Sequence, residues 1–392
     1  MKIAVGLSGG VDSSVAAWML KQQGHEVTGL FMINWHDTEG TLSGDCPWRD
    51  DIIFARLVAR KLDIPLETID LSREYRRRVV DYMFEEYRCG RTPNPDVLCN
   101  REIKFDLFAE AAFEHGAQYV ATGHYCRTET LTLAGEPTYR LLAGSDPGKD
   151  QSYFLCQLSQ KQLSAAIFPI GSLMKSEVRR IAEENGLVTA RRKDSQGICF
   201  VGKVDLPVFL QQQLKAKEGT IIEIPATFNG FVRNLPADLH GKLKTLAAPY
   251  RYCQTDGRTV GKHCGAHFFT IGQRKGLNVG GMKEPLFVIG TDVERNIIYT
   301  GQSDRHPGLY HSALFIPAAR IHWVRPDQAM TEGEERIMRV RVRYRQPLQK
   351  ATLYRMPEGM YILFDEPQRG VTPGQFAAWY DNDELIGSGV IQ

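Results

Sequence analysis

The 392-residue chain has no apolar run long enough to cross a bilayer, and it contains neither repeats nor low-complexity segments. Its net charge is only +2, so an RNA site would have to be a local basic patch rather than a property of the whole surface. The first residues read as a buried strand and not as a signal peptide. These absences favour a cytoplasmic globular protein that has no membrane partner, and the length allows two or three domains.

The eight cysteines include no CxxC pair, which disfavours a zinc ribbon, and the chain is too long for a disulfide-stapled scaffold. Two of them lie in loops near cations, which lower the pKa of a thiol. Cys99 ends the segment PNPDVLC and is followed by Arg101, whereas Cys199 lies in DSQGICF after the basic run 191–193. We therefore predict that Cys99 and Cys199 are reactive, and we expect Cys46 not to be catalytic.

Strand and helix patterns alternate over the first half of the chain, which is typical of a mostly parallel sheet with helices on both faces. Two alternating runs around residues 134–136 predict a hairpin inserted into this domain. Short strands dominate later, although residues 236–265 read as irregular. The sequence predicts an α/β fold with an N-terminal catalytic domain, a small central β-rich domain and a C-terminal β-barrel. The expected bounds are 1–205, 206–285 and 286–392.

A glycine- and serine-rich loop follows the first predicted strand and leads directly into a helix. It reads Gly6, Leu7, Ser8, Gly9, Gly10, Val11, Asp12, Ser13, Ser14. Glycines let backbone N–H groups turn toward an anion, and the N-terminus of a helix favours negative charge. The loop lacks the lysine of a Walker A motif and does not fit GxGxxG. It predicts a phosphate site, and the carboxylate of Asp12 indicates a role for Mg²⁺.

This loop resembles that of N-type ATP pyrophosphatases, and the whole chain resembles the tRNA-specific 2-thiouridylase family. The matching segments are SGGVDSS, PNPDVLCN, ATGHY, KDQSYFL, DSQGICF, TIGQRKGL and VRYRQ…VTPGQ, in the family's order. The resemblance implies ATP-dependent adenylation of uridine 34, the wobble base of certain tRNAs, at its C2 oxygen. Sulfur then replaces that oxygen, giving 2-thiouridine, AMP and pyrophosphate. Residues 247–256 depart from the family pattern and read as an insertion.

The resemblance also implies roles for individual residues. Cys199 would carry the incoming sulfur as a persulfide, delivered by a sulfur-relay protein or a cysteine desulfurase. Cys99 would be the second catalytic cysteine and would end in a disulfide with Cys199. Besides the loop from Gly6 to Ser13, ATP would contact Met32 and Gly123. The target base would contact Asn94, Pro95 and Asp96, and the rest of the tRNA would contact His124, Lys149, Asp150, Gln151, Arg343, Tyr344 and Gln375.

Alternative interpretations stay open at this point. Asp96, Cys99 and Cys199 could instead hold a 4Fe-4S iron–sulfur cluster whose fourth iron binds sulfide. Hydrosulfide released by Cys99 could attack the base in place of the persulfide. An ATP pyrophosphatase that amidates a small molecule would need no paired cysteines, and a non-enzymatic tRNA-binding sulfur carrier would form no AMP.

Overall fold

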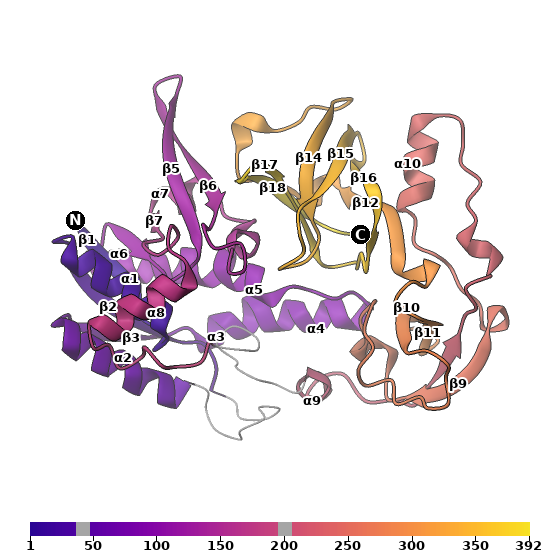
Figure 1. The fold of residues 1–392 in the computed structure, drawn as a ribbon, viewed down its shortest axis with the longest axis horizontal. Coiled ribbons are helices and arrows are strands. Elements are labelled where there is room, and N and C mark those ends of the chain that lie inside the picture. Colours follow the sequence, from indigo (N-terminus) through magenta and orange to yellow (C-terminus); the bar gives the residue numbers. More distant parts are fainter. Residues whose placement is uncertain (37–47, 195–205) are drawn as a thin grey trace.

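The computed structural model describes residues 1–36, 48–194 and 206–392. Cys46 and Cys199 both lie outside these described residues. Figure 1 shows the N-terminal parallel-sheet domain on one side, the C-terminal barrel above the centre, and a small central sheet beside them. None of the helices in the described ranges is both long and apolar enough to span a membrane.

The N-terminal domain is built on a parallel sheet that, within the described residues, has the strand order β3-β2-β1-β4-β7. The central strand β1 pairs in parallel with β2 on one side and with β4 on the other. At such a switch in direction, the loops that follow the two neighbouring strands open a crevice where ligands bind. The strands are β1 (Lys2–Gly6), β2 (Glu26–Ile33), β3 (Leu66–Asp70), β4 (Tyr119–Ala121) and β7 (Ala166–Ile167).

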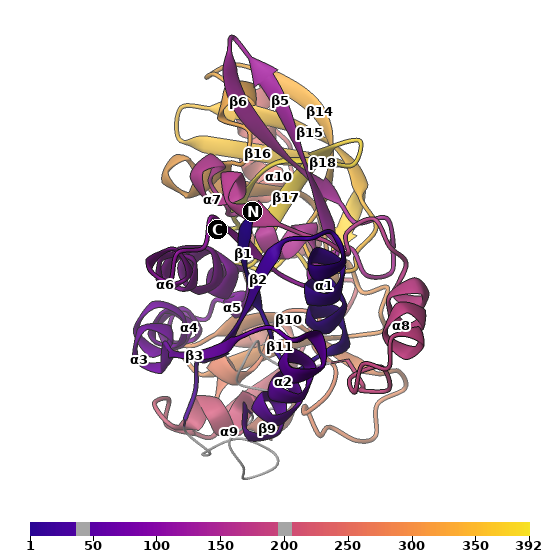
Figure 2. The same cartoon turned by 90° about the vertical axis from the view of Figure 1, so that its left-hand side faces the viewer.

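Helices cover both faces of this sheet (Figure 2), so the predicted α/β fold class is confirmed for this domain. Side chains alternate between the faces: Ile3 and Val5 join one apolar cluster, and Ala4 joins the other. One face carries α1 (Val11–Gln22), α2 (Trp48–Leu62) and α8 (Lys175–Glu184). The other carries α3 (Ser72–Tyr75), α4 (Asp81–Arg88), α5 (Pro95–Leu98), α6 (Phe108–Glu114) and two π-helical segments, Arg76–Val80 and Cys99–Leu107.

The small central sheet has the strand order β10-β11-β8-β9. Its strands are β8 (Gly219–Glu223), β9 (Arg258–His263), β10 (Leu286–Asp292) and β11 (Ile297–Gln302), with α9 (Leu206–Gln211) preceding them. The expectation that residues 236–265 are irregular was wrong, because they contain β9 and the helix α10 (Leu239–Ala247). Asp238 caps α10 by accepting a hydrogen bond from Gly241 N at 2.7 Å, and only Leu243 is fully buried. A helix that buries so little apolar surface has a weak periodic pattern.

The third sheet forms the C-terminal barrel from β12 (Tyr310–Pro317), β13 (Ile321–Trp323), β14 (Glu335–Arg341), β15 (Gln349–Met356), β16 (Gly359–Arg369), β17 (Phe376–Asp381) and β18 (Glu384–Val390). The predicted hairpin is present as β5 (Cys126–Leu133) and β6 (Glu136–Ala143). It is not confined to the first domain, however, since β6 pairs with β18 of the barrel. This pairing covers one edge of the hairpin and part of one edge of the barrel, which would otherwise be open.

Residues 150–160, which include part of α7 (Gln160–Ser164), fasten the N-terminal domain to the barrel. Asp150 lies 3.1 Å from the guanidinium of Arg341, within ion-pair distance though outside hydrogen-bond geometry, and both side chains are buried. The Tyr153 hydroxyl donates to the carbonyl of Phe376 at 3.0 Å. These buried polar contacts fix how the barrel sits on the catalytic domain.

Candidate functional site

The phosphate loop occupies the switch point of the parallel sheet, between the end of β1 and the start of α1. Gly9 has φ +73°, and a Cβ at this position would clash with the carbonyl oxygen of Asp51. Ser8 N donates to Ser13 Oγ at 3.2 Å, which closes the loop on itself. Arg192 donates to the Gly9 carbonyl at 2.7 Å and holds the loop from outside. No side chain caps α1, so its first turn offers backbone N–H groups to an anion.

Gly123 belongs to the loop after β4, on the other side of the switch point. A Cβ on Gly123 would lie 2.7 Å from Ser13 N and 2.8 Å from Asp12 C, so only glycine allows this close approach to the phosphate loop. Met32 lies on β2 and is buried, with 6% of its surface exposed. The structure therefore brings Gly123 against the phosphate loop, whereas Met32 packs in an apolar cluster of the same domain.

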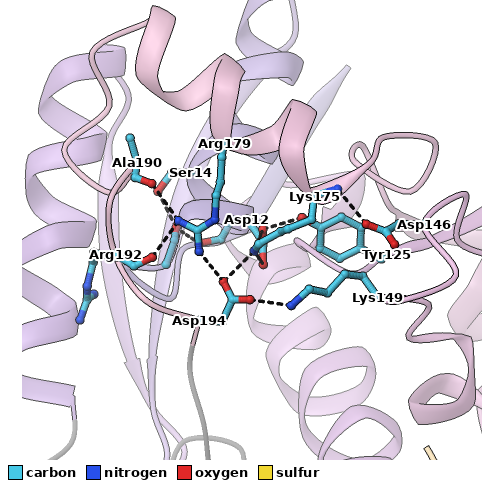
Figure 3. A network of polar contacts seen from close by, with 12 residues as sticks. Asp12, Ser14, Tyr125, Asp146, Lys149, Lys175, Arg179, Ala190, Arg192 and Asp194 are labelled. Atoms are coloured by element: carbon cyan, nitrogen blue, oxygen red, sulfur yellow. Dashed lines mark hydrogen bonds and ion pairs between the residues drawn. The ribbon is translucent and has the colours of Figure 1, made fainter. Parts of the chain in front are cut away.

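Asp12, the second residue of α1, is bound by a lysine that the sequence analysis did not single out (Figure 3). Lys175 Nζ donates to both carboxylate oxygens of Asp12, at 2.6 and 2.8 Å. The Tyr125 hydroxyl donates to the same carboxylate at 2.8 Å, and its pKa is raised by burial and by the neighbouring Asp12 charge. Lys175 begins α8, which packs against α1. In the sequence, the available signal was a basic residue at the start of the segment that forms α8.

Three cations converge on Asp194 beside this contact (Figure 3). Its carboxylate lies 2.7 Å from Lys149 Nζ, 2.9 Å from Lys175 Nζ and 2.9 Å from a guanidinium nitrogen of Arg179. Partial burial works to raise the pKa of Asp194, but hydrogen bonds from Lys149 and Lys175 outweigh it and lower the pKa to about 2. The three cations around Asp194 therefore strongly favour a negatively charged group at this position.

The segment before Cys99 is a shaped loop that leads into α5, as its prolines predict. Asn94 caps the helix by accepting a hydrogen bond from Val97 N at 3.3 Å, and Pro95 is the first helical residue. Cys99 follows at the start of a π-helical segment and is fully buried. In the described ranges, no three His, Cys, Asp or Glu side chains are placed to hold a metal ion. Cys199, the remaining expected cluster ligand, lies outside these ranges.

Gln375 of the barrel binds segment 92–94, which contains the expected base contact Asn94. Gln375 Nε2 donates to the carbonyls of Thr92 and Pro93, at 2.9 and 3.0 Å, and Asn94 Nδ2 donates to Gln375 Oε1 at 3.5 Å. Thr92 N donates in turn to the Pro373 carbonyl at 2.9 Å. A residue expected to touch tRNA therefore binds another part of the same chain, 281 to 283 residues earlier.

Arg343 and Tyr344 lie at the same junction of domains. Arg343 donates to the Ile271 carbonyl at 2.9 Å and to Thr372 Oγ1 at 3.0 Å, and burial lowers the pKa of its guanidinium. The ring of Tyr344 packs against Phe154, with the ring centres 4.3 Å apart. Both side chains are half-buried.

Two of the residues that were expected to contact tRNA are buried. His124 Nδ1 lies 2.7 Å from Thr122 Oγ1, and burial lowers the pKa of its imidazole well below the usual value. Asp150 accepts hydrogen bonds from Gly144 N and Ser152 N, at 3.1 and 3.0 Å, besides its ion pair with the barrel. The half-buried remainder comprises Asn94, Pro95, Asp96, Lys149, Gln151, Arg343, Tyr344 and Gln375.

Comparison with known protein families agrees with this architecture. Residues 1–203 match a family model described as the tRNA methyl transferase HUP domain. Residues 235–302 match the tRNA methyl transferase PRC-barrel domain, and residues 315–391 match the aminomethyltransferase beta-barrel domain. The three matches follow the order of the three sheets and confirm the predicted fold class.

Full-length relatives identify the family more narrowly. The chain is 60% identical over 395 residues to the tRNA-specific 2-thiouridylase MnmA of Christiangramia forsetii, covering all of this chain and 99% of that one. It is 58% identical to the protein of the same name from Flavobacterium johnsoniae and 44% identical to that of Karelsulcia muelleri, covering 99% and 98% of those chains. The chain therefore belongs to the tRNA-specific 2-thiouridylase family, an enzyme family of sulfurtransferases.

Proposed function

We propose that this chain uses ATP to activate C2 of uridine 34 in tRNA and then replaces the C2 oxygen with sulfur. One observation carries the proposal: a phosphate loop lies at the switch point of the sheet and is closed by Gly123, in a chain that is 60% identical to a tRNA-specific 2-thiouridylase along its length. A tRNA substrate supports a cytoplasmic location for this reaction.

The C2 oxygen of uracil is a poor leaving group, so it must be activated before sulfur can replace it. This oxygen attacks the α-phosphorus of ATP. Pyrophosphate leaves, and the base remains adenylated. The outer sulfur of a Cys199 persulfide then adds at C2, and AMP departs with the former C2 oxygen. Cys99 thiolate attacks the Cys199 sulfur, which forms the disulfide and leaves the thiolated base. An external thiol reductant supplies the two electrons that return the disulfide to two thiols, and a sulfur-relay protein or a cysteine desulfurase then supplies the persulfide again.

The base enters beside the segment that precedes Cys99. We assign base contact to Asn94, Pro95 and Asp96, which are half-buried at the start of α5 and within five residues of Cys99. Reaching this segment requires uridine 34 to leave the anticodon stack, which is usual for chemistry on a base.

The remaining tRNA contacts divide into three groups. Gln151, Arg343 and Tyr344 are half-buried, so they can meet the tRNA directly. His124 and Asp150 are buried, and we assign them to supporting the site from behind. Gln375 acts on the tRNA through the segment 92–94, to which its amide is bound.

Mg²⁺ would accompany ATP at the phosphate loop. The carboxylate of Asp12 offers the oxygen donors that this ion prefers, and the ion would neutralise part of the phosphate charge. Asp12 also orients Lys175 toward the loop, through the two hydrogen bonds between them.

The adenylation half-reaction tests this proposal without a sulfur donor. The purified chain would be incubated with ATP labelled at the α-phosphate and with tRNA carrying either uridine or adenosine at position 34. We expect pyrophosphate release and labelled tRNA with uridine 34 only, and the same from Cys199→Ser because the thiols act later. Pyrophosphate release without tRNA would instead indicate amidation of a small molecule. Binding of tRNA with neither pyrophosphate release nor labelling of the tRNA would indicate a sulfur carrier.

A further inference from the structure

The contacts around Asp194 define a compact cation cluster whose residues come from separate segments of the sequence. Its members are Lys149, Lys175 and Arg179, each within 2.9 Å of the Asp194 carboxylate (Figure 3). Lys149 lies in the segment between β6 and α7, whereas Lys175 and Arg179 lie one turn apart on α8. Two separate parts of the chain therefore bring these cations to one point.

This cation cluster adjoins the phosphate loop through Lys175. Its ammonium bridges Asp194 and Asp12, and Asp12 is the second residue of the helix that the loop begins. Lys175 also lies 5.6 Å from the centre of the Tyr125 ring and is only 12% exposed, so its position is well defined by packing. The ammonium thus lies beside the first turn of α1, next to the phosphate loop.

The charges of this arrangement favour an anion at the position that Asp194 occupies. Three cations face the carboxylates of Asp12 and Asp194, and the Asp146 carboxylate lies beside them, accepting a hydrogen bond from Lys175 N at 2.9 Å. Without the Asp194 charge these groups carry one positive charge in excess, and the low pKa of Asp194 is consistent with this. The β- and γ-phosphates of ATP need cations, and the phosphate loop itself contains no lysine or arginine.

We propose that Lys149 and Lys175 bind the β- and γ-phosphates of ATP and then the pyrophosphate product, exchanging the Asp194 carboxylate for phosphate oxygens. The assignment rests on the proposed use of ATP and gives Lys149 a ligand other than tRNA. Arg179 has a positioning role, since it also donates to the carbonyls of Ala190 and Arg192, at 3.0 and 3.1 Å.

The test compares a nucleotide that has the outer phosphates with one that lacks them. The affinities of α,β-methylene-ATP and of AMP would be measured by calorimetry for wild type, Lys149→Met and Lys175→Met. We expect each variant to bind α,β-methylene-ATP between about 10-fold and 150-fold more weakly, since a hydrogen bond to a charged group contributes about 1.5–3 kcal/mol, and to bind AMP unchanged. Arg180→Met is the matched control, because Arg180 lies on the same helix but is exposed and paired with Glu184. It should change neither affinity.

Asp194→Asn separates phosphate binding from a purely structural role. If Asp194 competes with phosphate, removing its charge should tighten α,β-methylene-ATP binding about fivefold, the effect of one unit charge at about 4 Å in water. Weaker binding by Asp194→Asn, or an equal loss for AMP and α,β-methylene-ATP in both lysine variants, would overturn the proposal. Should Lys175→Met not fold, Lys149→Met and Asp194→Asn decide. An enzyme that passes these tests but never adenylates tRNA would refute the proposed function and keep this inference.

Discussion

Replacing Gln375 by alanine should slow thiolation without weakening ATP binding. The amide of Gln375 donates two hydrogen bonds to the backbone of Thr92 and Pro93, next to Asn94. A neutral hydrogen bond contributes about 0.5–1.5 kcal/mol, so the substitution loosens this segment by about 1–3 kcal/mol. If the reactive geometry needs the segment in place, the rate at saturating tRNA should fall between about 5-fold and 160-fold.

The assay is single-turnover formation of 2-thiouridine at saturating tRNA, with tRNA affinity measured separately. Gln349→Ala is the control, because the Gln349 amide donates only within its own turn, to the Pro347 carbonyl at 3.0 Å. Gln375→Glu should be as slow as Gln375→Ala, since a carboxylate cannot donate to the two carbonyls. A variant that loses tRNA affinity but keeps the wild-type rate at saturation would show that Gln375 contacts the tRNA and does not position the segment.

Three further predictions concern packing, burial and protonation. Gly123→Ala should abolish ATP binding while the chain stays folded, because its Cβ would lie 2.7 Å from Ser13 N; unchanged nucleotide affinity by calorimetry would refute the close approach. Asp150→Asn should lower the free energy of unfolding in urea by about 3–5 kcal/mol, because Arg341 is left buried without its counter-charge; a loss below about 1 kcal/mol would contradict this. Burial lowers the pKa of His311 to about 4. Between pH about 6.5 and 4, this imidazole therefore binds a proton in the unfolded chain but not in the folded chain. The free energy of unfolding should therefore fall as the pH is lowered through this window, and it should fall less in His311→Phe; equal slopes for the two proteins would refute the assignment.

Local features of the site could be predicted from the sequence because neighbouring residues determine them. Glycine and serine at the end of the first strand specify the phosphate loop, and Asn94 with Pro95 specifies the start of a helix. The hairpin β5–β6 was predicted from the two alternating runs that flank its turn, and the structure places Ala134 and Gly135 of that turn at positive φ. Each of these predictions needed only a few consecutive residues.

Contacts between distant segments could not be predicted in this way. Lys175 meets Asp12 across 163 residues, and Gln375 meets Thr92 across 283. The pairing of β6 with β18 depends on how the barrel docks, which no local pattern encodes. The cation cluster therefore became visible only once the N-terminal domain was folded, and the Gln375 contact only once the barrel was placed against that domain.

The central claim is that ATP activates uridine 34 and that Cys199 and Cys99 then deliver sulfur in sequence. The most direct measurement reconstitutes wild type, Cys99→Ser and Cys199→Ser with ATP, tRNA and a persulfide donor, and quantifies 2-thiouridine and adenylated tRNA by mass spectrometry. We predict 2-thiouridine from wild type only, with adenylated tRNA accumulating in Cys199→Ser. Full activity of Cys199→Ser would contradict the persulfide assignment, and wild-type activity that depends on bound iron would favour the 4Fe-4S cluster over the disulfide.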